Sequence, residues 1–192
     1  MTLPKPKSSW LRIKNCIRGH SQEDLINLIS ELYSLTQINK DFLSSKFLQN
    51  NQILIIDRYK KAITKHIAPN EPWKENQAIN IKAGKNTLNE YEKIFNNDHI
   101  GLIDLMLHYV ECGSNFSIEF GVYESYHISL EAIFAKALKL MKQYPDCERQ
   151  DFLNRTFLIL ELTKNKMWKG HFERMQEIFD EYYPHNSFSC DR

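Results

Sequence analysis

Apolar residues recur every three or four positions along most of this 192-residue chain. This spacing places them on one face of an α-helix. The chain has only six Gly and six Pro, which argues against a turn-rich β-sandwich. The pattern therefore predicts an all-α protein, a multi-helix bundle of about eight helices with short connections.

Three pairs of predicted helices look like antiparallel hairpins: 21–33 with 39–48, 98–119 with 126–143, and 148–164 with 171–183. A short α-solenoid of helical hairpins is therefore an alternative to a compact bundle. No sequence motif repeats at a fixed period, so this alternative depends on the architecture alone.

Several residues mark where helices begin and end. Ser21, with Asp24 three residues later, resembles a capping box and starts one of the clearest helices. Gly121 predicts the end of the helix that begins near Asp98. Pro145 ends the next helix, because proline cannot continue a helical hydrogen-bond pattern.

The segment 98–119 is the apolar centre of the chain. Its apolar residues point in almost every direction around a helix, which is typical of a core helix, and Gly113 leaves room for a close neighbour. We expect a single core between this helix and the next, formed by Ile103, Leu107, Val110, Ile133, Phe134 and Leu138.

The predicted helices and breaks suggest a domain plan. Residues 1–20 form a basic amino-terminal segment with a short helix, residues 21–184 a single helical domain, and residues 185–192 a tail. Pro69 and Pro72 interrupt the pattern, so sub-lobes 21–68 and 78–184 joined by a linker at 69–77 are a variant of this plan.

Four polar residues interrupt the apolar helix at regular spacing: Asp104, His108, Glu111 and Asn115 project from one face. Buried polar groups need hydrogen-bond partners, so we interpret this stripe as structural, with Asp104 and Glu111 holding the 113–127 connection. A metal site between helices is the alternative, but the H-x-x-E spacing of His108 and Glu111 is common by chance. We therefore expect no metal and no cofactor.

Several stretches together resemble an uncharacterised bacterial family of small helical proteins, of the kind classed as a domain of unknown function. The stretches are DLMLHYVECG (Asp104 to Gly113), SLEAIFAKALKL (Ser129 to Leu140), SQEDLINLISELY (Ser21 to Tyr33) and the turn at Gly170 to Phe172 within MWKGHFERMQEIFDEYY. The resemblance implies a helical fold and a bacterial origin, and it implies no mechanism.

The amino-terminal segment is a cationic run without acidic residues. Lys5, Lys7, Arg12, Lys14 and Arg18 all precede the first acidic residue, Glu23, and Trp10 lies among them. Such a cluster can pair with phosphates and stack on a base, so nucleic acid is a candidate partner. The net charge of the whole chain is only +1, which weighs against a dedicated nucleic-acid-binding protein.

Aromatic residues gather at the carboxyl end. Most follow helical spacing and should be core residues. Trp168, Tyr183 and Phe188 are the candidates for a patch that binds a protein partner, because large aromatic side chains are favoured in interfaces.

Other features narrow the class of protein. The four cysteines are widely scattered and favour free thiols. No apolar run is long enough to span a bilayer, so we expect a cytoplasmic protein without membrane contact. The sequence lacks P-loop, G-x-S-x-G, G-x-G-x-x-G and H-E-x-x-H motifs. These features favour a non-enzymatic binding or adaptor protein, with a nucleic-acid accessory protein second and a metal-dependent enzyme at Asp104, His108 and Glu111 third.

Overall fold

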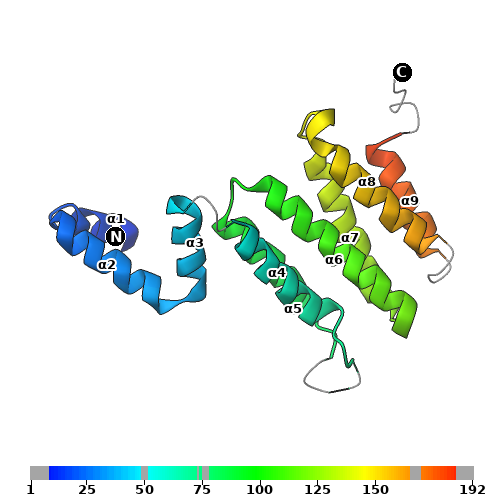
Figure 1. Cartoon of the computed structure of the whole chain (residues 1–192), viewed down its shortest axis with the longest axis horizontal. Coiled ribbons are helices and arrows are strands. Elements are labelled where there is room, and N and C mark those ends of the chain that lie inside the picture. Colours follow the sequence, from blue (N-terminus) through cyan, green and yellow to red (C-terminus); the bar gives the residue numbers. More distant parts are fainter. Residues whose placement is uncertain (1–8, 49–51, 73, 75–77, 165–169, 185–192) are drawn as a thin grey trace, which may run out of the picture. The chain divides into compact units, whose positions relative to one another are not determined.

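The computed structural model describes residues 9–48, 52–72, 74, 78–164 and 170–184. Within these ranges the chain forms nine α-helices and no strand, so the predicted all-α helical bundle is confirmed (Figure 1). Contacts between residues divide the chain into two compact units, Met1–Asn51 and Gln52–Arg192. Each unit is described separately.

The first unit contains α1 (Ser9–Ile17), α2 (Gln22–Leu35) and α3 (Gln37–Phe47). The capping box predicted at Ser21 is present: its Oγ accepts from the Asp24 amide and its own amide donates to the Asp24 carboxylate, both at 3.1 Å. Thr36 ends α2 and caps α3 by accepting from the Asn39 amide at 3.1 Å. One residue, Thr36, separates the two helices, and α2 and α3 contact each other.

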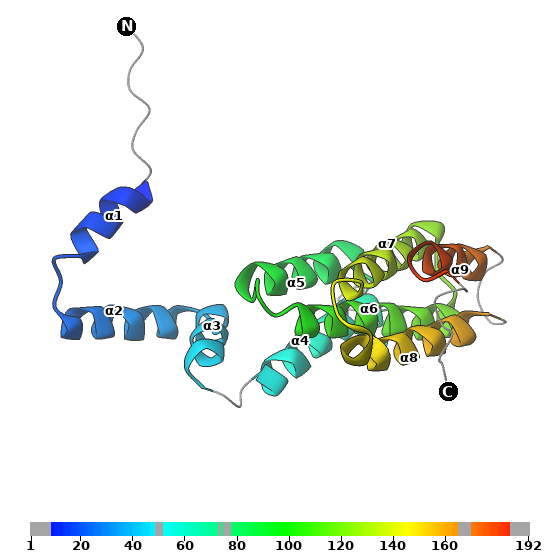
Figure 2. The same cartoon turned by 90° about the horizontal axis from the view of Figure 1, so that it is seen from above.

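The second unit contains six helices, with α6 at the centre: α4 (Gln52–Ile67), α5 (Ile81–Ile94), α6 (His99–Phe120), α7 (Glu124–Met141), α8 (Asp146–Thr163) and α9 (His171–Tyr182). Figures 1 and 2 show α6 running alongside α4, α5, α7 and α8. The main contacts link the hairpin α4–α5 to α6, and the hairpin α6–α7 to α8 and α9. The second unit is thus a bundle built from three consecutive helix pairs.

The core lies where the sequence predicted it. Ile103, Leu107 and Val110 of α6 and Ile133, Phe134 and Leu138 of α7 are all buried, with at most 8% of any of them exposed. Gly113 permits this close approach of α7, because the side chains of Leu130 and Tyr126 occupy the space that a Cβ would need. Gly121 ends α6 with a positive φ of 65°, as expected for a glycine stop.

The division between the units falls before α4, not at the predicted linker 69–77. Ile55, Tyr59, Ile63 and Ile67 of α4 are buried in the core of the second unit, where α4 packs against α5 and α6. The helices on the two sides of residues 69–77 therefore belong to one unit. The tail 185–192 lies outside the described residues.

None of the helices in the described ranges combines the length and the apolar character needed to cross a bilayer.

Candidate functional site

The polar stripe of α6 meets a basic residue from α8. Arg155 donates from Nη1 to Asp104 Oδ1 at 2.6 Å, and from Nε and Nη2 to the two oxygens of Glu111, both at 2.8 Å. Lys60 of α4 lies on the other side, with Nζ 2.8 Å from Asp104 Oδ2. The acidic face of α6 therefore links this helix to α4 and α8. Glu111 forms a bidentate pair with Arg155, and Asp104 is shared between Arg155 and Lys60.

The cluster is partly exposed, which corrects the expectation of a buried stripe. The Asp104 side chain is 20% exposed and that of Glu111 is 30% exposed. Their partners come from α4 and α8, and none of these bonds involves the 113–127 connection that the sequence favoured. Asn115 is exposed, and its amide nitrogen donates back to the Glu111 carbonyl at 2.9 Å, so it stands outside the cluster.

Arg155 carries a positive charge, as a structural ion pair with Asp104 and Glu111 requires. Burial disfavours the guanidinium ion, but the hydrogen bonds and charges of Glu111 and Asp104 outweigh this effect and raise the pKa of Arg155. Both carboxylates are thereby engaged by a permanent cation. Within the ranges that the structure describes, no three His, Cys, Asp or Glu side chains come together as potential metal ligands.

His108 lies between this cluster and a cavity. Its Nε2 is 2.9 Å from Thr64 Oγ1 of α4. Burial and the charge of Lys60 lower the pKa of His108, so the imidazole is neutral near pH 7. The sequence places His108 on the same helix face as Asp104 and Glu111, but its hydrogen-bond partner is the hydroxyl of Thr64 on α4.

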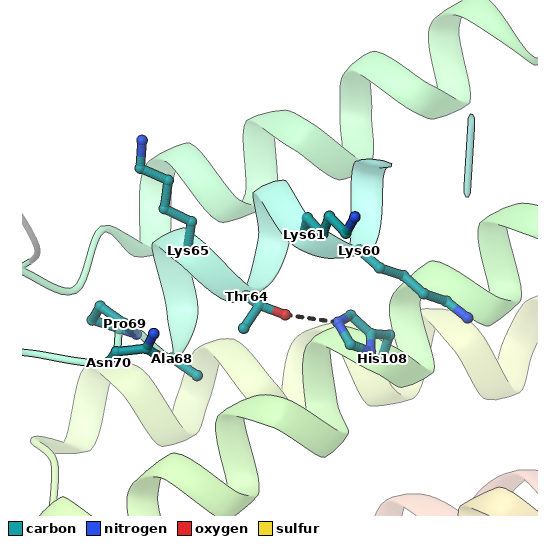
Figure 3. Close-up of a pocket in the computed structure, with 8 residues that line it drawn as sticks. All are labelled: Lys60, Lys61, Thr64, Lys65, Ala68, Pro69, Asn70 and His108. Carbon is teal, nitrogen blue, oxygen red and sulfur yellow. Dashed lines mark hydrogen bonds between the residues drawn. The ribbon is translucent and has the colours of Figure 1, made fainter. Parts of the chain in front are cut away.

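The cavity beside His108 has a volume of about 580 Å³ and lies along α4 (Figure 3). Its lining contains three lysines and no carboxylate: Lys60, Lys61, Thr64, Lys65, Ala68, Pro69, Asn70 and His108. We call it the lysine pocket. Sequence reasoning missed it, although the run of basic residues between 60 and 65 on one helix was its available signal.

The predicted nucleic-acid segment is described only in part. Arg12, Lys14 and Arg18 are exposed on or just after α1, together with Trp10. Lys5 and Lys7 lie outside the described residues.

Tyr183 is the one residue of the predicted aromatic patch at the carboxyl end that the structure describes, and it does not have the expected exposure. Tyr183 is only 3% exposed, because its ring stacks on Phe179 and Arg149 lies over its face. A residue buried in this way cannot form an exposed partner-binding patch. Trp168 and Phe188 lie outside the described residues.

The structure describes the side chains of two cysteines, and both are free thiols. Cys16 is exposed and Cys112 is partly buried. Burial raises the pKa of Cys112 to about 12, so its thiol remains protonated at neutral pH and is a poor nucleophile.

The helices of the first unit expose a large amount of apolar surface. No residue of α2 is buried, although seven of its 14 residues are Leu, Ile or Tyr. A groove of about 340 Å³ runs between α2 and α3, lined by Ile26, Ile29, Ser30, Tyr33, Leu43, Ser44, Phe47 and Leu48. We call it the apolar groove.

Comparison with protein-family models, with curated proteins and with solved structures gives no match for this chain. Its function must therefore be argued from its own residues.

The Arg155 cluster gives a direct test of its role. We expect Asp104→Asn and Glu111→Gln each to lower the free energy of unfolding by about 1 to 3 kcal/mol, because each leaves Arg155 with an imperfect partner. The exposed pair of Glu161 with Lys164 provides the control, and Glu161→Gln should change stability by less than about 1 kcal/mol. Thermal and urea unfolding followed by circular dichroism would measure all three variants. Stabilised Asp104 or Glu111 variants would instead indicate polar groups held for function at the expense of stability.

Proposed function

We infer that this protein is a non-enzymatic adaptor that binds a partner protein through the apolar groove of α2 and α3. The observation that carries this proposal is the exposure of α2, whose apolar residues find no core within their own unit. Burying such residues is a main source of folding and binding free energy. Contiguous exposed apolar patches on soluble proteins commonly mark interaction surfaces.

The shape of the groove favours a helical partner. Ile26, Ile29 and Tyr33 line one wall at helical spacing, while Leu43 and Phe47 line the other. Phe47 is 77% exposed, which leaves a large aromatic side chain available as an anchor. An amphipathic helix presenting apolar residues at positions i, i+3, i+4 and i+7 fits a groove of this kind.

The charges beside the groove favour an acidic partner. Lys40 lies over the ring of Tyr33 at 5.8 Å, and Lys46 lies over Phe42 at 5.7 Å. Residues 1–51 contain seven Lys or Arg against four Asp or Glu. We therefore propose an amphipathic helix whose apolar stripe is flanked by acidic residues, since complementary charge promotes association.

The test is site-specific photo-crosslinking from position 47 in the full-length protein, combined with affinity purification from the host. We expect a crosslink to a second protein, and we expect Ile29→Asp to reduce its recovery by about tenfold or more, as for a central interface residue. Leu158→Asp is the control, because Leu158 is also a highly exposed apolar residue but lies on α8. Crosslinks confined to the same chain or to a second copy, or recovery insensitive to Ile29→Asp, would refute the adaptor proposal.

Nucleic acid is the second candidate partner, favoured by the exposure of Arg12, Lys14, Arg18 and Trp10. The same purification should be scored for bound nucleic acid. Retention that falls steeply with salt and depends on these cations would support this alternative, because phosphate contacts release counterions. The metal-dependent enzyme considered third is less well supported, since Arg155 engages the carboxylates of both Asp104 and Glu111.

A further inference from the structure

The lysine pocket on the second unit is independent of the apolar groove and has a different chemistry. We propose that it binds the phosphate groups of a phosphorylated small molecule, with the ring of that molecule in an adjoining cavity. The volume of about 580 Å³ lies within the range of small-molecule sites. Small-molecule ligands in such sites are oriented by a few polar groups, and here these groups are cationic or hydrogen-bonding.

The electrostatics of the pocket favour an anion. Lys61 and Lys65 are exposed, and in the described part of the chain neither has an ion-pair partner. Lys60 adds a third charge, which is shared with Asp104. With no carboxylate in the lining, an incoming phosphate would meet uncompensated positive charge.

The carboxyl-terminal end of α4 opposes phosphate binding only weakly. Helix ends of this polarity carry partial negative charge on free carbonyl groups. Here the carbonyls of Thr64, His66 and Ile67 accept hydrogen bonds at 2.8 Å from the Ala68 amide, the Asn80 amide and the Tyr126 hydroxyl. Lysine side chains at a helix end also complement its dipole, so their presence alone would be unremarkable. The cavity that they surround is what points to a ligand.

The directions of the side chains indicate more than one anionic group. Figure 3 shows the ammonium groups of Lys60 and Lys65 extending away from each other along the helix, with Thr64 and His108 between them. Two or more linked phosphates would offer one anionic group to each ammonium.

An adjoining cavity of about 370 Å³ supplies the place for a ring. It shares Ala68, Pro69 and Asn70 with the lysine pocket, and its other lining residues are Cys112, Asn115, Phe116, Glu119 and Phe120. The rise along α6 from His108 to Asn115 is about 10 Å, comparable with the reach of a nucleotide from phosphate to base. Glu119 lies at the ring end, so charge repulsion would direct the phosphates to the lysine end.

His108 should report on phosphate binding. It faces Lys60 of α4 and Arg155 of α8, while Asp104 and Glu111 share its own helix. Burial and Lys60 lower its pKa, and a bound phosphate would offset that positive charge. We therefore expect its pKa to rise when a phosphate occupies the pocket.

The experiment is a titration of the full-length protein with adenosine triphosphate and, separately, with inorganic tripolyphosphate. We expect adenosine triphosphate to bind, tripolyphosphate to compete with it, and the double variant Lys61→Gln/Lys65→Gln to weaken binding by about tenfold or more. Lys82→Gln is the matched control, because Lys82 is an exposed lysine on α5 outside the lining. The His108 ring resonance should titrate at higher pH in the presence of adenosine triphosphate.

Four results would overturn the proposal. They are no binding of either phosphate compound, equal weakening by Lys82→Gln and the double variant, a His108 titration unmoved by ligand, and lysine-dependent binding of an oligonucleotide much tighter than that of adenosine triphosphate. The last result would identify a nucleic-acid surface. The double variant should fold normally because both lysines are exposed, and circular dichroism would check this.

Discussion

Replacing Leu107 with alanine should lower the free energy of unfolding by about 2 to 5 kcal/mol. Leu107 is fully buried in α6, the helix that contacts α4, α5, α7 and α8. Shortening its side chain removes apolar contacts on the central helix of the unit and leaves a cavity that the surrounding helices can fill only in part. Both the lost transfer free energy and the cavity contribute to the cost.

Urea unfolding of the full chain, followed by circular dichroism, would measure this loss. Leu158→Ala is the control: Leu158 is 69% exposed on α8, so its truncation should change stability by less than about 0.5 kcal/mol. An unfolding midpoint for Leu107→Ala that matched the control would mean that this face of α6 does not point into the core.

The central core could be predicted from the sequence because local pattern and tertiary packing agree there. An apolar helix such as 98–119 must be surrounded by other helices, whatever their order. The helix boundaries at Ser21 and Gly121 were predictable for a similar reason, since a capping box and a glycine stop depend only on neighbouring residues.

The partner of the polar stripe could not be read from the same pattern. Periodicity shows that Asp104 and Glu111 share one face, but it does not say which helix covers that face. Arg155 lies 44 residues beyond Glu111 in the chain. One signal was available: Arg155 falls on the apolar side of α8, between Phe152 and Ile159, where a cation requires a partner.

The boundary between the two units shows the limit of composition as a guide. Pro69 and Pro72 mark a break between helices, but a break in a helix is not a break in packing. The apolar face of α4 decides the boundary, because Tyr59 and Ile63 are buried with α5 and α6. The predicted linker 69–77 is therefore a connection inside the second unit.

A pair of buried histidines should make the protein sensitive to acid. His127 of α7 and His171 of α9 are both buried, and their ring centres are 4.5 Å apart. His171 Nδ1 also lies 2.8 Å from Glu131 Oε1. Burial, together with the nearby His171, lowers the pKa of His127 to about 4 from its usual 6.5. Burial also lowers the pKa of His171, although Glu131 opposes this change.

The sign of the effect follows from where the protons bind. Between about pH 6.5 and pH 4 the unfolded chain binds a proton at His127 while the folded chain does not, so acid favours unfolding. For His127 alone the stability present above pH 6.5 should decline by up to about 3 kcal/mol as the pH falls to about 4.

Melting temperatures measured across this range should therefore fall for the parent protein. In His127→Gln the decline should be clearly smaller, because the group that titrates has been removed. His20→Gln is the control, since it removes an exposed histidine of the first unit. Parallel pH profiles for the parent protein and His127→Gln would show that this histidine pair does not set the acid stability.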